Sequence, residues 1–297
     1  MEKVQLCDNG PVVSPIIYSF WRALENPDGV SLAAVENKVN LCLELGITTF
    51  DHADVYGNYE VESLFGKALK RKSFKREDIV LSTKCGINLV DPSRPNYRLK
   101  HYDSSAEHLI ESVKRSLANL QTDYIDILLL HHPDPLMDAD ETGSALTQLV
   151  NSGMVHHVGV ANFSVNQQRL LQSRLPVPIV TNHLELNLLK TKPLTDGTLD
   201  FLKENYSRPL AWAPLAGGQI LDPNNESSFE VRRALERVAP KYNANVEQIA
   251  IAWLLKLGAL PIVGTNSEQR IRYATSATSI QLDRQDWYEI YFAATAK

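Results

Sequence analysis

Residues 49–57 read TFDHADVYG, and this segment joins the end of an apolar strand to a tyrosine five residues later. Asp51 closes the strand, and Tyr56 lies in the glycine-bearing loop behind it. Two further apolar runs also end in polar residues, at Lys84 and at His131. A carboxylate, a phenol, an ammonium and an imidazole at strand ends are groups that can together protonate a carbonyl oxygen.

Apolar β-rich runs alternate with amphipathic helical patterns along the whole chain. Eight runs are short and apolar on both faces, as strands of a buried parallel sheet are; they cover 15–20, 48–51, 79–84, 125–131, 155–160, 179–182, 209–213 and 260–263. Helical patterns cover 31–45, 62–69, 143–152, 165–173, 197–205, 229–242, 246–257, 268–276 and 284–295. Ser104 and Glu107 have the spacing of a capping box that opens one more helix.

Eight strands that are each followed by a helix predict an α/β fold, a (β/α)8 barrel that spans 1–297 as a single domain. An open doubly wound sheet is the second possibility. Its nucleotide-binding form carries Gly-x-Gly-x-x-Gly after the first strand, whereas Trp21 and Arg22 stand there. The longest irregular stretch, 86–103, follows the third strand and is expected to overhang the substrate pocket.

Composition narrows the function classes. The chain has 297 residues, 44% of them hydrophobic, which suffices for one large core. A net charge of −5 with dispersed Lys and Arg argues against a nucleic-acid partner. No apolar run approaches the roughly 20 residues that span a bilayer, and the first residues lack a signal-peptide pattern. Cys7, Cys42 and Cys85 lack metal-ligand spacing, so we expect a reducing, cytoplasmic location. Composition does not predict an oligomeric state.

The four polar residues at the strand ends form a plausible catalytic set. In a barrel of this kind the carboxyl ends of the strands meet at one rim, so Asp51, Tyr56, Lys84 and His131 can converge there. The Lys84 ammonium would favour the phenolate of Tyr56 and lower its pKa. Asp51 would hold Lys84, and His131 would orient the substrate oxygen. Each residue alone could equally be a packing or capping residue. His131 and His132 point to opposite faces, which argues against a metal site.

The order and spacing of these segments resemble the aldo-keto reductase family from Trp21 to about Trp287. The match includes the Asp51–Tyr56–Gly57 segment, the strand ends at Lys84 and His131, and GVANF at 159–163, which is similar to the family's GVSNF. The forms HADVYG and HHPDPLMD resemble a bacterial-type oxidoreductase branch.

The resemblance implies carbonyl reduction with NADPH as the cofactor and a small-molecule carbonyl as the substrate. It implies that Tyr56 donates the proton, that Lys84 activates it and that Asp51 and His131 support them. It also implies contacts with the cofactor along the barrel mouth. Asn162 would hold the carboxamide and Trp212 would stack on the ring; the other contacts would come from Trp21, Asp51, His183, Ala213, Leu215, Gly217, Gly218, Val263, Gly264, Thr265, Asn266 and Arg270.

Four positions depart from the family pattern. Ala161 replaces a serine and His183 replaces a glutamine beside the carboxamide. Gly264 stands where some branches carry a lysine for the 2′-phosphate, and Ala274 stands where an asparagine often contacts adenine. These departures concern the affinity for the cofactor and the preference for NADPH, and none of them falls on the four catalytic residues.

The substrate pocket is expected to include Phe20, Trp21, Tyr59, His132 and the 86–103 stretch. Aromatic side chains near a barrel mouth suggest an apolar or aromatic aldehyde or ketone. Ordinary core packing explains Phe20 and Tyr59 equally well. A cofactor-binding regulatory subunit of the same fold, with little turnover, is the alternative function. A lyase that uses Lys84 as a Schiff base is disfavoured by the spacing of Asp51 and Tyr56.

Overall fold

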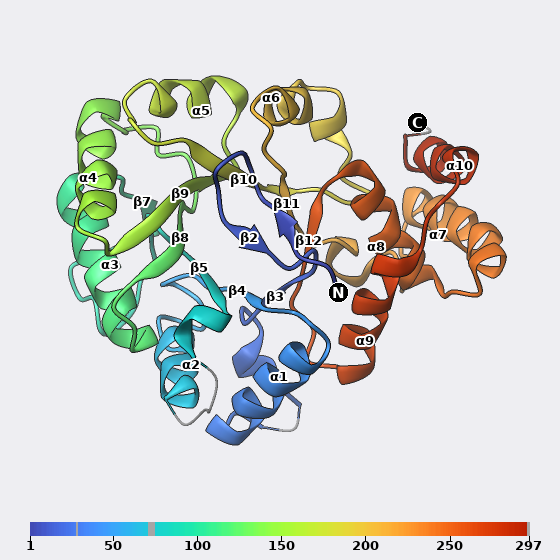
Figure 1. Ribbon diagram of the computed structural model, residues 1–297, viewed down its shortest axis with the longest axis horizontal. Coiled ribbons are helices and arrows are strands. Elements are labelled where there is room, and N and C mark those ends of the chain that lie inside the picture. The colour runs from blue at the N-terminus through green and yellow to red at the C-terminus, as the bar shows by residue number, and fades with distance from the viewer. Residues whose placement is uncertain (28, 71–74, 296–297) are drawn as a thin grey trace.

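The computed structural model describes residues 1–27, 29–70 and 75–295. Its centre is a closed barrel of parallel strands in the order β10-β11-β12-β3-β4-β5-β8-β9 (Figure 1). This closure confirms the predicted barrel and rules out the open sheet. The strands are β3 (Ile17–Ser19), β4 (Thr49–Asp51), β5 (Val80–Cys85), β8 (Ile125–Leu130), β9 (Val155–Ala161), β10 (Ile179–Glu185), β11 (Leu210–Trp212) and β12 (Leu260–Val263).

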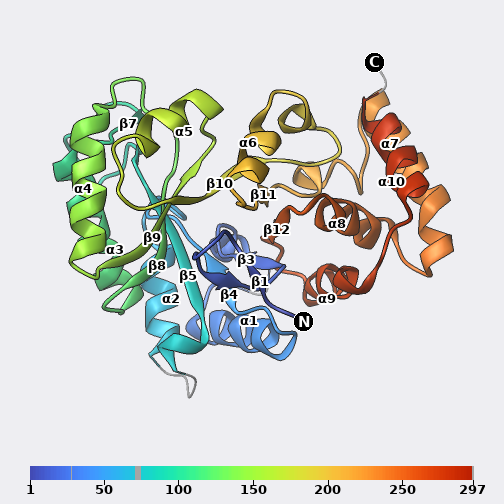
Figure 2. The same ribbon diagram turned by 45° about the horizontal axis from the view of Figure 1, so that its top comes forward.

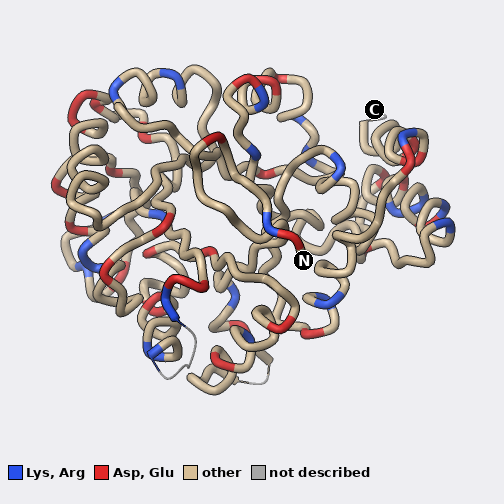
Figure 3. The backbone as a smooth tube through the Cα atoms, viewed as in Figure 1, with Lys and Arg blue, Asp and Glu red and all other residues tan. Residues whose placement is uncertain are grey.

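Helices surround the barrel. Within the described residues they are α1 (Leu32–Glu44), α2 (Val61–Leu69), α3 (Ala106–Leu120), α4 (Ala139–Asn151), α5 (Val165–Gln172), α6 (Thr198–Glu204), α7 (Glu226–Val238), α8 (Val246–Leu257), α9 (Glu268–Ser276) and α10 (Arg284–Thr295). Figure 2 shows α7 and α10 side by side at the edge of the ring. Figure 3 shows Lys and Arg interspersed with Asp and Glu along these helices.

Several helices begin or end away from the predicted positions. The cap of α3 is Ser105, whose side chain accepts from the backbone N–H of His108, so the predicted Ser104–Glu107 box is wrong. The side chain of Asp138 caps α4, which begins at Ala139, four residues before the expected start. Helix α7 starts at an Asn225 capping box and gives way to a 3₁₀ turn that contains Pro240. In each case a polar side chain or a proline sets the boundary.

Two short hairpins were not expected. β1 (Val4–Gln5) pairs with β2 (Val12–Val13), and Leu6 and Val13 pack with the barrel interior at Ile17 and Leu210. The hairpin therefore closes one end of the barrel (Figure 1). The second hairpin, β6 (Ile87–Asn88) with β7 (His101–Tyr102), orders the base of the long stretch after β5.

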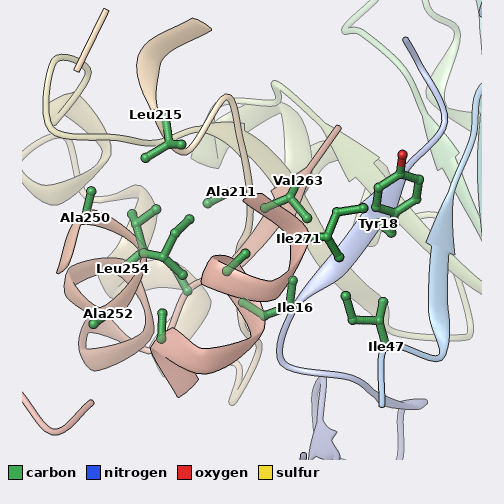
Figure 4. Packing of buried hydrophobic residues seen from close by; sticks show 14 of the residues in the cluster. Ile16, Tyr18, Ile47, Ala211, Leu215, Ala250, Ala252, Leu254, Val263 and Ile271 are labelled. Carbon is green, nitrogen blue, oxygen red and sulfur yellow. The ribbon is translucent and has the colours of Figure 1, made fainter. Parts of the chain in front are cut away.

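The main hydrophobic core lies between the barrel and its helices. Figure 4 shows Ile16, Ala211 and Val263 of the barrel side facing Leu254 of α8 and Ile271 of α9. All of these side chains are buried, and full burial of one leucine contributes about 2 kcal/mol relative to its exposed state. This packing fixes the strand ends that carry the polar side chains.

No helix among the described residues is long and apolar enough to cross a membrane. The cytoplasmic location, and the expectation that the chain has no nucleic-acid partner, stay predictions.

Candidate active site

The register of the parallel strands places their polar ends at one rim. Ser19 is paired with Asp51, and Asp51 with Ser82, two residues before Lys84. Lys84 in turn pairs with Leu129 of β8, so His131 follows on the neighbouring strand. Because neighbouring strands end together, the carboxylate, the ammonium and the imidazole are brought to the same place.

Lys84 is the centre of this arrangement. Its side chain is 1% exposed. Its Nζ donates to Asp51 Oδ1 at 2.7 Å, to the carbonyl of His52 at 2.7 Å and to the Tyr56 hydroxyl at 3.0 Å. An ammonium has three N–H donors, and all three are used. The buried charge is thus both paired and fully hydrogen-bonded, which offsets the cost of removing it from water.

Asp51 holds the lysine from the next strand. Its Oδ2 accepts from the Ser19 hydroxyl at 2.9 Å and from the Tyr56 hydroxyl at 3.4 Å. Ser19 is an addition to the predicted set. Its position at the end of the first strand, next to Asp51 at the end of the second, was the available signal. The structure therefore brings Asp51, Tyr56 and Lys84 together as predicted and adds Ser19 behind them.

Burial and the neighbouring charges set the protonation states of Tyr56 and Lys84. Burial raises the pKa of the Tyr56 phenol, and the nearby Lys84 ammonium offsets only part of that rise. For Lys84, burial alone would lower the pKa, but Asp51 and Tyr56 together raise it above its usual value. Lys84 lowers the pKa of Tyr56 as predicted, but burial, which the sequence does not reveal, outweighs this effect and leaves the pKa above its ordinary value. At neutral pH the site holds a charged lysine beside a protonated phenol.

His131 stands beside the phenol. The rings of Tyr56 and His131 lie edge to face, with centroids 6.2 Å apart. Burial, the Lys84 charge and His132 keep the pKa of His131 well below its ordinary value, so the imidazole is neutral. Its buried Nδ1 has no hydrogen-bond partner among the described residues. The N–H of a neutral imidazole at this place can donate a hydrogen bond to an oxygen atom that enters beside Tyr56.

Asn162 connects three strands at the rim. Its backbone is left-handed (φ 63°), a conformation that asparagine tolerates better than most residues. The side-chain amide donates to the carbonyl of His131 at 3.1 Å and faces His132 Nε2 at 3.4 Å. Its oxygen accepts from Trp212 Nε1 at 3.0 Å. Asn162 thus holds the end of β8 and the indole of β11 in one network.

His183 is a buried polar group of the site whose ring is unsatisfied. It is 4% exposed, and neither ring nitrogen has a hydrogen-bond partner among the described residues. Burial, Lys84 and His131 hold its pKa well below the ordinary value. A neutral imidazole offers one donor and one acceptor, and a primary carboxamide offers the complementary pair. A nicotinamide carboxamide at His183 would give one of these nitrogens a partner, so the residues present fit that group.

The loop after β11 contains four residues with a left-handed backbone. Ala213, Ala216, Gly217 and Gly218 all have positive φ, from 49° to 106°. Nothing lies within 4 Å of a Cβ built on either glycine, so backbone conformation and not crowding accounts for them. Within the loop, the N–H of Ala216 donates to the carbonyl of Ala213 and the N–H of Gly218 donates to that of Leu215. Leu215 lies within this loop, and the pyrophosphate contacts proposed from the sequence stay predictions.

The segment after β12 is fixed by three other elements. Tyr18 donates to the carbonyl of Thr265 at 3.0 Å, and the Asn266 amide donates to the carbonyl of Arg22 at 2.9 Å. Arg270, in the first turn of α9, directs its Nε at both carboxylate oxygens of Glu247, at 3.0 and 3.1 Å. Glu247 was not predicted, since nothing in its sequence context links α8 to Arg270.

Trp21 occupies the space in front of Gly264. The indole is 44% exposed, and a Cβ on Gly264 would lie 2.3 Å from its Nε1 and 2.4 Å from its Cδ1. The indole of Trp21 can therefore occupy this place only because residue 264 has no side chain.

We expect Gly264→Ala to displace the Trp21 indole and to cost about 1–3 kcal/mol of stability, as overpacking does. Urea unfolding and the tryptophan emission maximum measure both effects. In a Trp21→Ala background the same substitution should cost much less. An equal cost in both backgrounds would contradict this dependence on Trp21.

The substrate-pocket residues differ in exposure. Phe20 is 3% exposed, stacks on His52 at 5.2 Å and packs against Phe65, which favours a core role. The Tyr59 hydroxyl accepts from the backbone N–H of Leu89 at 2.8 Å, and so it anchors the loop after β5. Those two side chains support the site from behind.

His132 is half-buried, and Trp21 is exposed. The ring of His132 is 5.3 Å from that of Tyr102 in the β6–β7 hairpin.

Within the described part of the chain, no group of three or more His, Cys, Asp or Glu residues could hold a metal ion.

The model of the Aldo/keto reductase family matches residues 16–292. An oxidoreductase of Bacillus subtilis, YcsN, is 43% identical over 99% of this chain and 98% of its own length. The 6-dehydroglucose reductase of Agrobacterium fabrum is 42% identical over 100% of this chain and 99% of its own. A crystal structure of the thermostable aldo-keto reductase Tm1743 superimposes with a TM-score of 0.81 at 27% identity, covering 99% of this chain and 100% of that one.

These matches agree with the barrel and with the rim that it builds. Aldo-keto reductases are oxidoreductases that act on small-molecule carbonyl compounds. With a family model over nearly its whole length and relatives above 40% identity, this chain belongs to the aldo-keto reductase family.

Proposed function

We propose that this protein reduces an aldehyde or ketone to the alcohol, with NADPH as the hydride donor and Tyr56 as the proton donor. One observation carries the proposal: the Tyr56 hydroxyl accepts a hydrogen bond from a buried, Asp51-paired Lys84 and lies beside the neutral His131. Such a phenol keeps its proton at neutral pH and is held at the rim where a carbonyl oxygen can approach.

Each residue has one task. NADPH supplies the hydride when it is bound. The Tyr56 hydroxyl transfers its proton to the carbonyl oxygen as negative charge develops there. The phenolate that remains is stabilised by Lys84 at 3.0 Å, and Asp51 keeps that ammonium in place. His131 hydrogen-bonds the substrate oxygen and aligns it. A hydride and a proton are consumed, and an alcohol is formed.

The cofactor is proposed to lie across the rim. His183, which lacks partners for both ring nitrogens, and Asn162 would bind the carboxamide. The Trp212 indole, held by Asn162, would lie against the nicotinamide ring. The left-handed loop at Ala213–Gly218 would receive the pyrophosphate, and Arg270 would bind the 2′-phosphate.

Arg270→Ala should weaken NADPH binding by about tenfold or more and leave NADH binding near wild type, because only NADPH carries the 2′-phosphate. Arg270 is suited to this contact because its Nε is bound to Glu247, which fixes the orientation of the guanidinium. Quenching of tryptophan fluorescence gives both dissociation constants. Equal losses for the two cofactors would show that Arg270 does not contact the 2′-phosphate.

The side chains near His131 favour a hydroxylated substrate over a purely apolar one. His132, whose ring is 5.9 Å from that of His131, and Tyr102, 5.3 Å from His132, offer hydrogen-bonding groups there, whereas the apolar Phe20 lies in the core. Two relatives, 42% and 34% identical, are named 6-dehydroglucose reductase. We therefore propose a sugar-like aldehyde as the first substrate to test, beside aromatic aldehydes. Faster turnover of the aromatic aldehydes would overturn this substrate class and leave the reaction type intact.

A further inference from the structure

The two carboxylate oxygens of Asp51 serve different partners. Oδ1 accepts from Lys84 Nζ at 2.7 Å. Oδ2 accepts from the Ser19 hydroxyl at 2.9 Å and from the Tyr56 hydroxyl at 3.4 Å. A hydroxyl usually lies about 2.7–2.8 Å from the oxygen that accepts its hydrogen bond. Ser19 therefore makes the closer contact with Oδ2, and the carboxylate holds the Tyr56 proton only weakly.

The surroundings of Ser19 direct its hydroxyl at Asp51. Ser19 is 3% exposed, and the register of β3 against β4 places it beside Asp51. Its oxygen accepts from the backbone N–H of Trp21 at 3.4 Å. A serine hydroxyl has a single proton to donate. That proton is given to the carboxylate, because a charged acceptor makes a stronger hydrogen bond than a neutral one.

The contacts of the Tyr56 hydroxyl leave its proton available. The phenol oxygen accepts from Lys84 at 3.0 Å, so the ammonium contacts the oxygen and not the proton. If the Ser19 hydroxyl were absent, Oδ2 of Asp51 would be open to a closer hydrogen bond from Tyr56. A phenol bound in that way would have to break this hydrogen bond before it could protonate a carbonyl oxygen.

We propose that Ser19 is a positioning residue, whose hydroxyl occupies Oδ2 of Asp51 and so keeps the Tyr56 proton free for the carbonyl oxygen. The proposal rests on the carbonyl reduction proposed above. The proton passes from Tyr56 to the substrate, and Ser19 neither gains nor loses one. A hydrogen bond from Ser19 also lowers the pKa of Tyr56. Loss of the Ser19 hydroxyl should therefore raise that pKa further.

The titratable groups around Tyr56 come from four strands. Asp51 of β4 and Lys84 of β5 form the ion pair. His131, after β8, and His183 of β10 are neutral, because burial and the Lys84 charge keep the pKa of each well below its ordinary value. Neither imidazole titrates in the alkaline range. Lys84 does lose its proton there, so a probe on Tyr56 itself is needed to tell the two apart.

The test compares Ser19→Ala with Ser82→Ala. Ser82 pairs with Asp51 from β5, on the other side of β4, and is 1% exposed. Its hydroxyl has no hydrogen-bond partner among the described residues, which makes it a matched control. Ser19→Ala should lower kcat for carbonyl reduction about tenfold and move the alkaline limb of the pH profile up by about one unit, with KM and the Kd of NADPH near wild type. Ser82→Ala should change none of these values.

A fluorinated tyrosine at position 56 gives a measurement that needs no turnover. Its fluorine resonance reports the ionisation of that phenol alone, and the fluorine lowers the pKa of the phenol into a more accessible range. The resonance should titrate at higher pH in Ser19→Ala than in the wild type or in Ser82→Ala.

A lower rate in Ser19→Ala with no shift of the resonance would assign Ser19 a structural role and overturn the proposal, as would an unchanged rate. Equal losses in Ser19→Ala and Ser82→Ala would overturn it as well, because only Ser19 bonds to Asp51. A shifted resonance in a protein that reduces no carbonyl compound would uphold the control of the Tyr56 proton by Ser19. The proposed reaction would then fail separately.

Discussion

Tyr56→Phe should lower the rate of carbonyl reduction by about 10²–10⁴-fold while cofactor binding stays near wild type. The substitution removes one hydroxyl that accepts from Lys84 at 3.0 Å and donates to Asp51 at 3.4 Å, and it keeps the ring beside His131. Only the proton donor is lost. Steady-state kinetics with a fixed carbonyl substrate, together with cofactor titration, separate the two effects.

The pH profile gives a second test of the same residue. Because burial raises the pKa of Tyr56, reduction should be constant through neutral pH and fall only in the alkaline range, where the phenol loses its proton. Tyr59→Phe, which removes a hydroxyl that anchors a loop, is the matched control and should keep most of the rate. Comparable losses in both variants would contradict the role of Tyr56 as the acid.

Lys84→Met should abolish measurable reduction and also destabilise the fold by about 3–5 kcal/mol, because it leaves the buried Asp51 carboxylate without its cation. Asp51 is 1% exposed, so water cannot replace the lost ammonium. The carbonyl of His52 loses its partner as well. Urea unfolding measures the stability, and the cofactor-linked absorbance measures the activity.

A double variant separates charge from packing. Asp51→Asn with Lys84→Met removes both charges, so it should recover a large part of the stability and none of the activity. A double variant as unstable as Lys84→Met alone would mean that the lost packing of Lys84, and not the unpaired carboxylate, causes the destabilisation.

The repetitive parts of the fold were accessible from the sequence. Buried parallel strands are apolar on both faces, so the local pattern reveals the eight runs. The carboxyl ends of such strands meet at one rim of the barrel, so the topology places Asp51, Lys84 and His131 together. The helix boundaries were harder to predict. Several polar residues near each helix start could act as the cap, and only the backbone geometry shows that Asp138 and Ser105 do so.

Features that depend on distant contacts could not be predicted. The ion pair of Arg270 with Glu247 joins residues 23 apart on two helices. The pKa direction of Tyr56 depends on how deeply the assembled barrel buries it. Likewise, Gly264 is a departure from the family pattern in the sequence, and its cause, the indole of Trp21, is visible only in three dimensions.

The central claim is tested most directly by mixing the wild-type protein with NADPH and following the nicotinamide absorbance as carbonyl compounds are added, with tryptophan quenching as the binding signal. The account predicts NADPH binding followed by its oxidation with at least one aldehyde or ketone, and the corresponding alcohol as the product. NADPH binding without oxidation across sugar-like, aliphatic and aromatic carbonyl compounds would contradict it and would favour a regulatory, cofactor-binding role.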